Sequence, residues 1–225
     1  ARRRAEARGR GVARGQQRLG HRVVQQSRPC RLRGGIGRPA GQVQAQAALD
    51  PRDREAGAQR VGDPRECHAI AVDARAPKFD GGIVTRLDCI PFGIVVNSFG
   101  HRFYDEGEDV WPKRYAIWGK LIARQPGQIA YPIVDAKTAD TFMPSVFPPV
   151  VANSIGELAR LLTLPPEALE ATVETFNRAV RPGTLNLSAL DDCRTEGLNP
   201  NKTHWAQPLD TPPYWAYPLR PGITF

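Results

Sequence analysis

Two short apolar runs, residues 67–73 and 93–97, are each bounded by turn residues. Apolar runs of this length between turn residues are typical of buried β-strands. Residues 97–100 are predicted as a turn, and residues 101–106 mix polar and aromatic positions, as a half-exposed strand does. We therefore expect residues 93–106 to form a β-hairpin.

Strand character returns twice further along the chain. Residues 128–135 form a third apolar run, in which Pro132 predicts an edge strand or a bulge because proline cannot donate a ladder hydrogen bond. Near the end of the chain, the aromatic residues Tyr214, Trp215 and Tyr217 are spaced as in a strand that returns to the same sheet.

Helical character is found first after Pro112, where residues 113–124 fit a helix. A second helix is expected over residues 154–162. Ser154 would be its N-cap, and Glu157 follows three residues later, which is the spacing of a capping box.

A third helix is expected over residues 166–180, because proline opens this segment and a proline–glycine pair follows it. Its apolar side chains recur with the helical period and would face a core. They are Leu169, Val173, Phe176 and Val180. The polar residues 184–203 are predicted to be irregular.

The positive charge of the chain lies at one end. Residues 1–50 contain 12 Arg and only two acidic residues, whereas the other 175 residues carry 19 basic and 21 acidic side chains. The folded part is thus nearly neutral, and no nucleic-acid-binding surface is expected on it. No apolar run approaches the roughly 20 residues that span a bilayer. The four widely spaced cysteines favour a reducing cytoplasm.

The arginine-rich start of the chain, residues 1–54, has no period of apolar residues and no aromatic residue. Two interpretations stay open: a disordered basic segment, or a stretch of a GC-rich gene translated out of frame. Residues 35–40 formally fit the dinucleotide pattern G-x-G-x-x-G/A. We reject this match, because no buried strand precedes it and Pro39 would interrupt the helix that must receive the phosphates.

The rest of the chain, from about residue 55 to residue 225, resembles the fumarate reductase/succinate dehydrogenase-type flavoproteins, and among them the tricarballylate dehydrogenase branch. The segments that carry the resemblance are residues 82–88, 93–97, 102–107, 111–116, 144–149, 202–205 and 220–225.

The resemblance implies an α+β fold, with a small mixed sheet and flanking helices, as in the capping domain of these flavoproteins. It implies a remnant of the FAD-binding domain at residues 55–92, a substrate-binding capping domain at residues 93–205, and a strand returning to a truncated FAD domain at residues 206–225. The nucleotide-binding halves are not expected in this chain, so it should bind FAD poorly or not at all.

The resemblance also assigns a catalytic residue. In these enzymes an arginine that follows an Arg-Phe-x-x-Glu strand transfers the proton, and Arg114 is the match, behind an insertion at residues 108–111. Lys113 is the rival for this role. The alternative is that Arg114 forms a surface ion pair with Asp105 or Glu108.

Substrate contacts are implied for three further residues. His68 matches a histidine that holds a substrate carboxylate, although a structural role is equally open. Thr85 matches a threonine that contacts substrate. Arg86 replaces an acidic residue of the fumarate reductases and suits a substrate with an additional carboxylate. The position of their proton-relay arginine is occupied by Cys89, and Asp88 is the candidate to take over the relay.

At the far end, the substrate-contacting histidine of the fumarate reductases falls at Phe225, and His204 is the candidate replacement. The alternative for His204 is packing against Trp205. The cysteines have no paired ligand spacing, so no metal site is predicted.

Together these features predict part of an FAD-dependent oxidoreductase that dehydrogenates tricarballylate or a similar polycarboxylate, with an electron acceptor that the sequence does not identify. Two alternatives are a nucleic-acid-binding protein that uses residues 1–54 as a basic arm, and a non-catalytic dicarboxylate-binding module.

Overall fold

The computed structural model describes residues 67–78 and 81–223, which belong to one compact unit. The predictions for residues 1–54, and for the glycine pattern at residues 35–40, lie outside the described residues.

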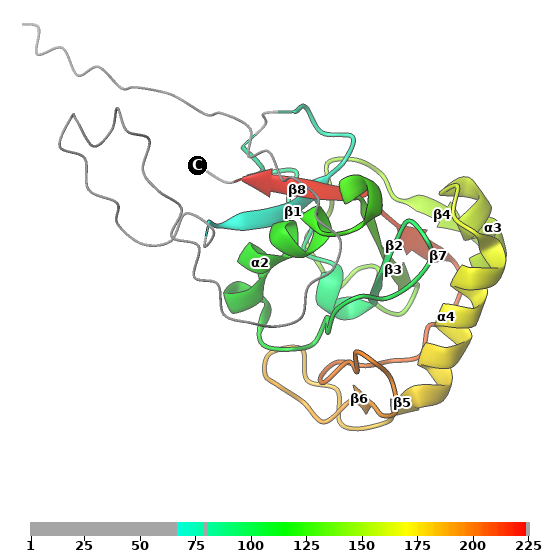
Figure 1. Ribbon diagram of the computed structural model, residues 1–225. Coiled ribbons are helices and arrows are strands. Elements are labelled where there is room, and N and C mark those ends of the chain that lie inside the picture. The colour runs from blue at the N-terminus through cyan, green and yellow to red at the C-terminus, as the bar shows by residue number, and fades with distance from the viewer. Residues whose placement is uncertain (1–66, 79–80, 224–225) are drawn as a thin grey trace, which may run out of the picture. The chain divides into compact units, whose positions relative to one another are not determined.

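A six-stranded antiparallel sheet forms the centre of the described part, with helices packed on it (Figure 1). The predicted α+β class is confirmed. The six strands are β1 (Ala69–Asp73), β2 (Ile94–Asn97), β3 (Ala130–Asp135), β4 (Val150–Ala152), β7 (Tyr214–Ala216) and β8 (Leu219–Ile223). They follow the order β1-β8-β3-β7-β4, and β2 also pairs with β3. Strands β1 and β8, from opposite ends of the described chain, therefore lie side by side (Figure 1).

Strand β3 is central, so the prediction of an edge strand at Pro132 was wrong. Strand β2 pairs with it, and so do β7 and β8, in a single register that matches Ile133 with Ala216 and Ala130 with Leu219. This register sets Pro132 opposite Tyr217, at the break between β7 and β8. A proline is tolerated inside the sheet here because its missing N–H faces a point where the ladder is interrupted.

Both faces of the sheet are buried. Alternate side chains of β2 and β3 enter two apolar clusters: Val96 and Ile133 belong to one, and Val95 and Val134 to the other. Burial on both faces explains why the sequence of these strands is continuously apolar rather than alternating.

The helices are α2 (Trp111–Ala123), α3 (Ile155–Leu161) and α4 (Pro166–Ala179), close to the predicted bounds. The capping box of α3 is confirmed: Ser154 Oγ accepts from the backbone N–H of Glu157 at 3.1 Å, and Glu157 Oε2 accepts from that of Asn153 at 3.1 Å. In α4 the predicted stripe is buried at Leu169, Val173 and Phe176.

Helix α2 packs closely against β1 and β8. Gly119 is the residue at the contact. A Cβ atom there would lie 2.6 Å from the backbone of both Ala69 and Ile70, so only glycine allows this approach. The close packing fixes the start of β1 beside the middle of α2, about one helical turn after Tyr115.

The predicted hairpin is present only in part. Residues 101–106 form no strand, and one isolated bridge joins Val96 to Arg102. The buried carboxylate of Glu106 turns back and accepts the backbone N–H of Val95 at 2.8 Å, taking the place of a strand partner. The remaining short elements are η2 (Ile90–Phe92), η3 (Pro126–Gln128), β5 (Val180–Arg181) and β6 (Arg194–Thr195).

Candidate functional site

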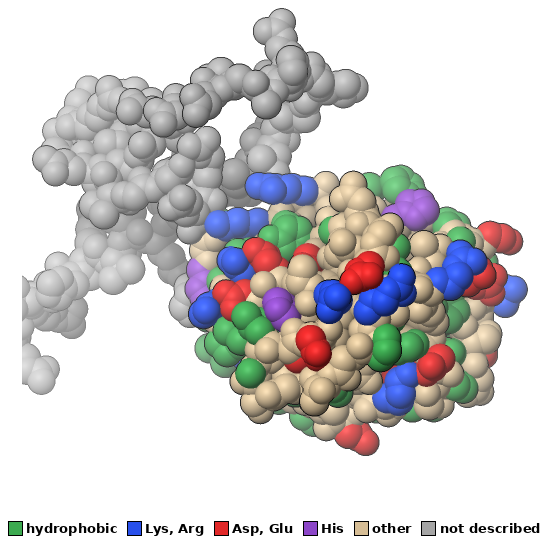
Figure 2. All heavy atoms as spheres, turned by 90° about the horizontal axis from the view of Figure 1, so that it is seen from below, with side chains coloured by type: hydrophobic (Ala, Val, Ile, Leu, Met, Phe, Trp, Pro, Cys, Tyr) green, Lys and Arg blue, Asp and Glu red, His purple; other side chains and the backbone are tan. Residues whose placement is uncertain are grey.

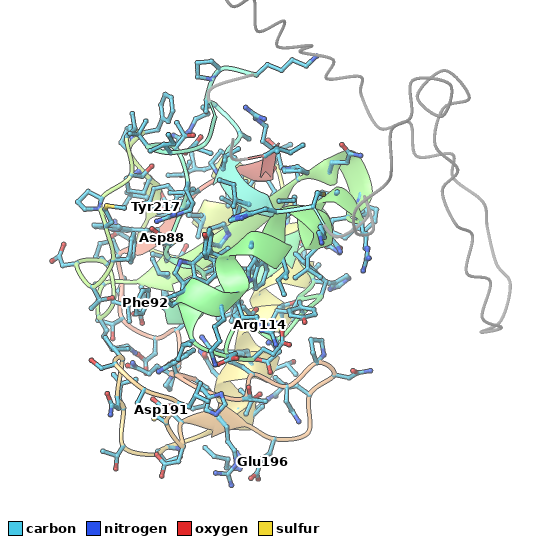
Figure 3. The ribbon with its side chains drawn as sticks, turned by 90° about the vertical axis from the view of Figure 1, so that its left-hand side faces the viewer. Asp88, Phe92, Arg114, Asp191, Glu196 and Tyr217 are labelled. Carbon is cyan, nitrogen blue, oxygen red and sulfur yellow. The ribbon has the colours of Figure 1, made fainter. Side chains whose placement is uncertain are left out.

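The first turns of α2 collect the cationic and aromatic side chains that the sequence singles out. The helix begins at Trp111, with Pro112 in its first turn, where the missing N–H of proline has no helical partner to lose. Arg114 and Tyr115 follow in the next turn. Arg114 projects from α2 on the side of the molecule shown in Figure 3, where Asp88 also lies.

Arg86 is held by a carboxylate two residues away. Its Nε and one Nη donate to the two oxygens of Asp88, at 2.8 and 3.0 Å. The same acid accepts from the indole N–H of Trp111 at 2.7 Å. The hydrogen bond to Asp88 raises the pKa of Arg86 above its ordinary value. Asp88 thus anchors the Arg86 side chain to the first residue of α2.

Tyr115 joins two of the predicted site residues. The Arg86 guanidinium lies over its ring, 5.1 Å from the centroid. The exposed imidazole of His68 meets the same ring at 5.0 Å in an edge-on arrangement. His68 and Arg86 are therefore brought together around one aromatic ring of α2.

Arg114 has a different carboxylate partner. One of its Nη atoms donates to Glu108 Oε1 at 2.8 Å, and the other oxygen of Glu108 accepts from the hydroxyl of Tyr104 at 2.5 Å. Burial, and then the hydrogen bond to Glu108, raise the pKa of Tyr104 to about 12. Arg114 Nε is buried and has no hydrogen-bond partner among the described residues.

His204 lies beside the same loop. Its Nδ1 is 2.6 Å from the carbonyl oxygen of Gly107, the residue before Glu108. A carbonyl oxygen only accepts, so Nδ1 carries the proton, and in the neutral ring Nε2 keeps its lone pair. The ring also packs against Trp205, with centroids 5.7 Å apart. The contact with substrate that was predicted for His204 stays a prediction.

The other candidates lie differently. Thr85 is buried, and its carbonyl accepts from the backbone N–H of Asp73. The side chain of Lys113 is 68% exposed and pairs with Asp109 at 3.3 Å. Cys89 is fully buried, and burial raises the pKa of its thiol. The structure thus brings His68 and Arg86 together at Tyr115, whereas Arg114, the preceding residue of α2, contacts Glu108, and Thr85 lies in the interior.

Sequence reasoning missed the groups that hold these cations. Tyr104, Trp111 and Tyr115 lie in segments that carry the resemblance, but no role was predicted for them. The four-residue spacing of Trp111 and Tyr115 sets both on one side of a helix, and it was the available signal.

The described residues do not themselves fit the nucleotide part of FAD. Every strand pair of their central sheet is antiparallel, so they contain no parallel strand–loop–helix unit that could present a glycine-rich loop to a pyrophosphate. They contain no group of three His, Cys, Asp or Glu side chains placed to hold a metal ion. No helix among them has the length and apolar character to cross a membrane.

Acidic and basic side chains are interspersed over the face of the described residues seen in Figure 2. This mixture agrees with the near-neutral charge of residues 51–225 and offers no extended basic surface on that face.

No model of a protein family matches the chain, and no curated protein matches its sequence. Among solved structures, the open conformation of a flavocytochrome c3 fumarate reductase is similar at a TM-score of 0.49 and 18% identity, over 71% of this chain and 26% of that one. A 3-ketosteroid-delta4-(5alpha)-dehydrogenase from Rhodococcus jostii gives a TM-score of 0.44 and 21% identity, over 68% of this chain and 29% of that one.

A 3-ketosteroid delta1-dehydrogenase from Sterolibacterium denitrificans gives a TM-score of 0.45 and 16% identity, over 70% of this chain and 33% of that one. The chain therefore spans a third or less of the length of these three structures. The similarity is to part of these oxidoreductases, and no substrate follows from it.

Proposed function

We propose that this chain is the substrate-binding part of an FAD-dependent oxidoreductase that dehydrogenates tricarballylate, or a similar polycarboxylate, at a carbon–carbon bond. In such a reaction the flavin takes up hydride and the protein removes a proton. The described residues do not fit the nucleotide part of the cofactor, so the proposal concerns only how they would hold the acid.

One observation carries the proposal: two nitrogen-bearing side chains meet at an aromatic ring of α2 that is next in sequence to Arg114, within a partly exposed surface. His68 and Arg86 contact the Tyr115 ring, and Arg114 is the preceding residue of the helix. A compound with several carboxylates needs several donors at fixed positions, which arginine provides through its planar fork. The resemblance of residues 82–116 to a family that acts on such acids points the same way.

The two arginines differ in what they can offer a ligand. The Nε-side edge of Arg86 is taken by both oxygens of Asp88, whereas Arg114 gives only one Nη to Glu108. Each arginine keeps its second Nη for a substrate carboxylate, and the additional unpaired donor of Arg114 is its buried Nε, which the single contact with Glu108 leaves unused.

Binding of the acid to the full chain tests the proposal without any flavin. Titration with tricarballylate, followed by calorimetry and by backbone amide shifts, should saturate, and succinate should bind more weakly. Arg114→Gln should weaken tricarballylate binding by about tenfold, the effect of losing one charge-assisted hydrogen bond of about 1.4 kcal/mol.

Lys113→Gln is the matched control, because it removes the same charge from the neighbouring residue of α2. Lys113 is exposed and paired with Asp109, so this variant should bind within about twofold of the unmodified chain. An equal loss of affinity in both variants would mean that only net charge matters, and the absence of saturable binding would refute the proposal.

A further inference from the structure

Glu108 occupies one of the two Nη atoms of Arg114, so a ligand carboxylate that contacts both Nη atoms must displace it. It lies in the insertion before α2, and its side chain is 31% exposed, close to the 35% of Arg114. Glu108 Oε1 accepts from an Arg114 Nη at 2.8 Å, which is the contact that a ligand carboxylate would make with the same nitrogen.

The ion pair between Glu108 and Arg114 is incomplete. Asp88 takes two donors of Arg86, side by side, whereas Glu108 takes a single Nη of Arg114 and leaves the buried Nε without a partner among the described residues. A buried donor without a partner is unfavourable, so this arrangement holds Arg114 less firmly than a two-point contact would.

Glu108 divides its oxygens between two donors. Oε1 accepts from Arg114, and Oε2 accepts from the Tyr104 hydroxyl at 2.5 Å. The same hydrogen bond gives Glu108 a partner that it would keep if Arg114 moved to another carboxylate.

We propose that Glu108 is an internal competitor for Arg114: an incoming carboxylate displaces it from the guanidinium, and Tyr104 retains the displaced carboxylate. The inference rests on the proposed function, since it assumes that Arg114 binds a ligand carboxylate. No covalent step is involved. Glu108 then lowers the affinity for the acid, because the ligand must first break the ion pair between Glu108 and Arg114. Tyr104 reduces this cost because it remains hydrogen-bonded to the displaced Glu108 carboxylate.

Two substitutions at the ends of one hydrogen bond should act in opposite directions. Glu108→Gln removes the competing charge but keeps the shape of the side chain, so tricarballylate should bind about threefold to tenfold more tightly. Tyr104→Phe deprives the displaced carboxylate of its remaining partner, so the same acid should bind about threefold more weakly.

The double variant measures how far the effect of Tyr104 on affinity depends on the charge of Glu108. Once Glu108 is neutral there is no displaced carboxylate to hold, so Tyr104→Phe should change the affinity of the Glu108→Gln protein by less than about twofold. A purely structural role of Tyr104 would instead lower the affinity equally in both backgrounds.

Asp109→Asn is the control for net charge. It removes the same charge one residue away, from an acid that pairs with Lys113 rather than with Arg114. Calorimetric titration of the full chain with tricarballylate should show no more than about a twofold gain for this variant. An equal gain in Asp109→Asn and Glu108→Gln would overturn the inference.

The outcomes separate this inference from the proposed function. If the unmodified chain binds tricarballylate and Arg114→Gln weakens binding, but Glu108→Gln does not strengthen it, the competitor role is excluded while the proposed function stands. If neither the unmodified chain nor Glu108→Gln gives saturable binding, both are excluded.

Discussion

The Nζ atom of Lys202 lies 2.7 Å from the carbonyl oxygen of Gly93, directly before β2. The lysine is only 1% exposed, and its other partner is the carbonyl oxygen of Pro91, also at 2.7 Å. Two carbonyl oxygens solvate an ammonium group less well than water does. Burial accordingly lowers the pKa of Lys202 from its ordinary value of 10.5 to about 8, against the opposing charge of Glu106.

This lysine should give the protein a distinct dependence of stability on pH. Between pH 8 and 10.5 the unfolded chain binds a proton at Lys202 that the folded chain does not, so the free energy of unfolding should rise with pH in that window. The rise is at most about 3 kcal/mol. Below pH 8 the charged form is buried and the unfavourable contribution is complete.

Urea unfolding of the unmodified chain and of Lys202→Met, at about pH 7 and about pH 10, measures this contribution. Methionine has a similar length and no charge. As the pH rises from about 7 to about 10, the free energy of unfolding of the unmodified chain should increase relative to that of Lys202→Met. Parallel pH profiles would show that Lys202 titrates as it does in the unfolded chain.

Gly119→Ala should destabilise the fold although alanine is the better helix former. The new Cβ would lie 2.6 Å from the backbone of β1, which cannot move without shifting the sheet or α2. We expect the free energy of unfolding to fall by about 1–3 kcal/mol, the usual cost of overpacking. Thermal and urea unfolding measure it.

Gly156→Ala in α3 is the matched control. Its Cβ would meet Glu170 Oε1, the end of a flexible side chain that can turn away. Stability should stay equal or rise by up to about 1 kcal/mol from helix propensity. A loss as large as that of Gly119→Ala would argue against a special contact between α2 and β1.

Ser154→Ala should weaken the start of α3. It removes the oxygen that accepts the N–H of Glu157, which costs about 1 kcal/mol at an N-cap. Ser188→Ala, at an exposed loop position, should be neutral within about 0.5 kcal/mol. Urea unfolding of both variants tests the comparison. Equal stabilities would show that the Ser154 cap does not stabilise α3.

The purified chain should lack bound flavin. Its described residues offer no parallel strand–loop–helix unit for the pyrophosphate. Absorbance spectra of the chain, after mixing with FAD and gel filtration, should show no stoichiometric band near about 450 nm, where an oxidised flavin absorbs. Retention of one flavin per chain would contradict the expectation.

Local signals in the sequence predicted the elements that are specified locally. The bounds of α4 follow from its prolines and apolar period, and the cap of α3 follows from Ser154 and Glu157. The strand β8 was not separated from β7, because its residues include Pro221 and its partner β1 lies about 150 residues away in the sequence. Pairing over such distances leaves no local periodicity to detect.

The candidate site divides in the same way. His68, Arg86 and Arg114 were singled out by residue type and resemblance, but the acids and aromatic donors that hold them became apparent only from the folded chain. Lys202, outside the candidate site, shows the same limit. A single lysine in a polar segment predicts an exposed side chain. Lys202 is buried only because its segment packs against residues 91–93 in the folded chain.

The interruption between β7 and β8, opposite Pro132, divides one extended segment into two strands with different outer partners. Strand β7 pairs with β4, which contacts α3. Strand β8 pairs with β1, the strand that directly follows His68. A single residue inserted at Tyr217 would leave the first half in place and turn every side chain of the second half to the opposite face. The two residues between β7 and β8 therefore keep the side chains of both strands on the correct faces, so that β4 packs against α3 while β1 lies beside Arg86.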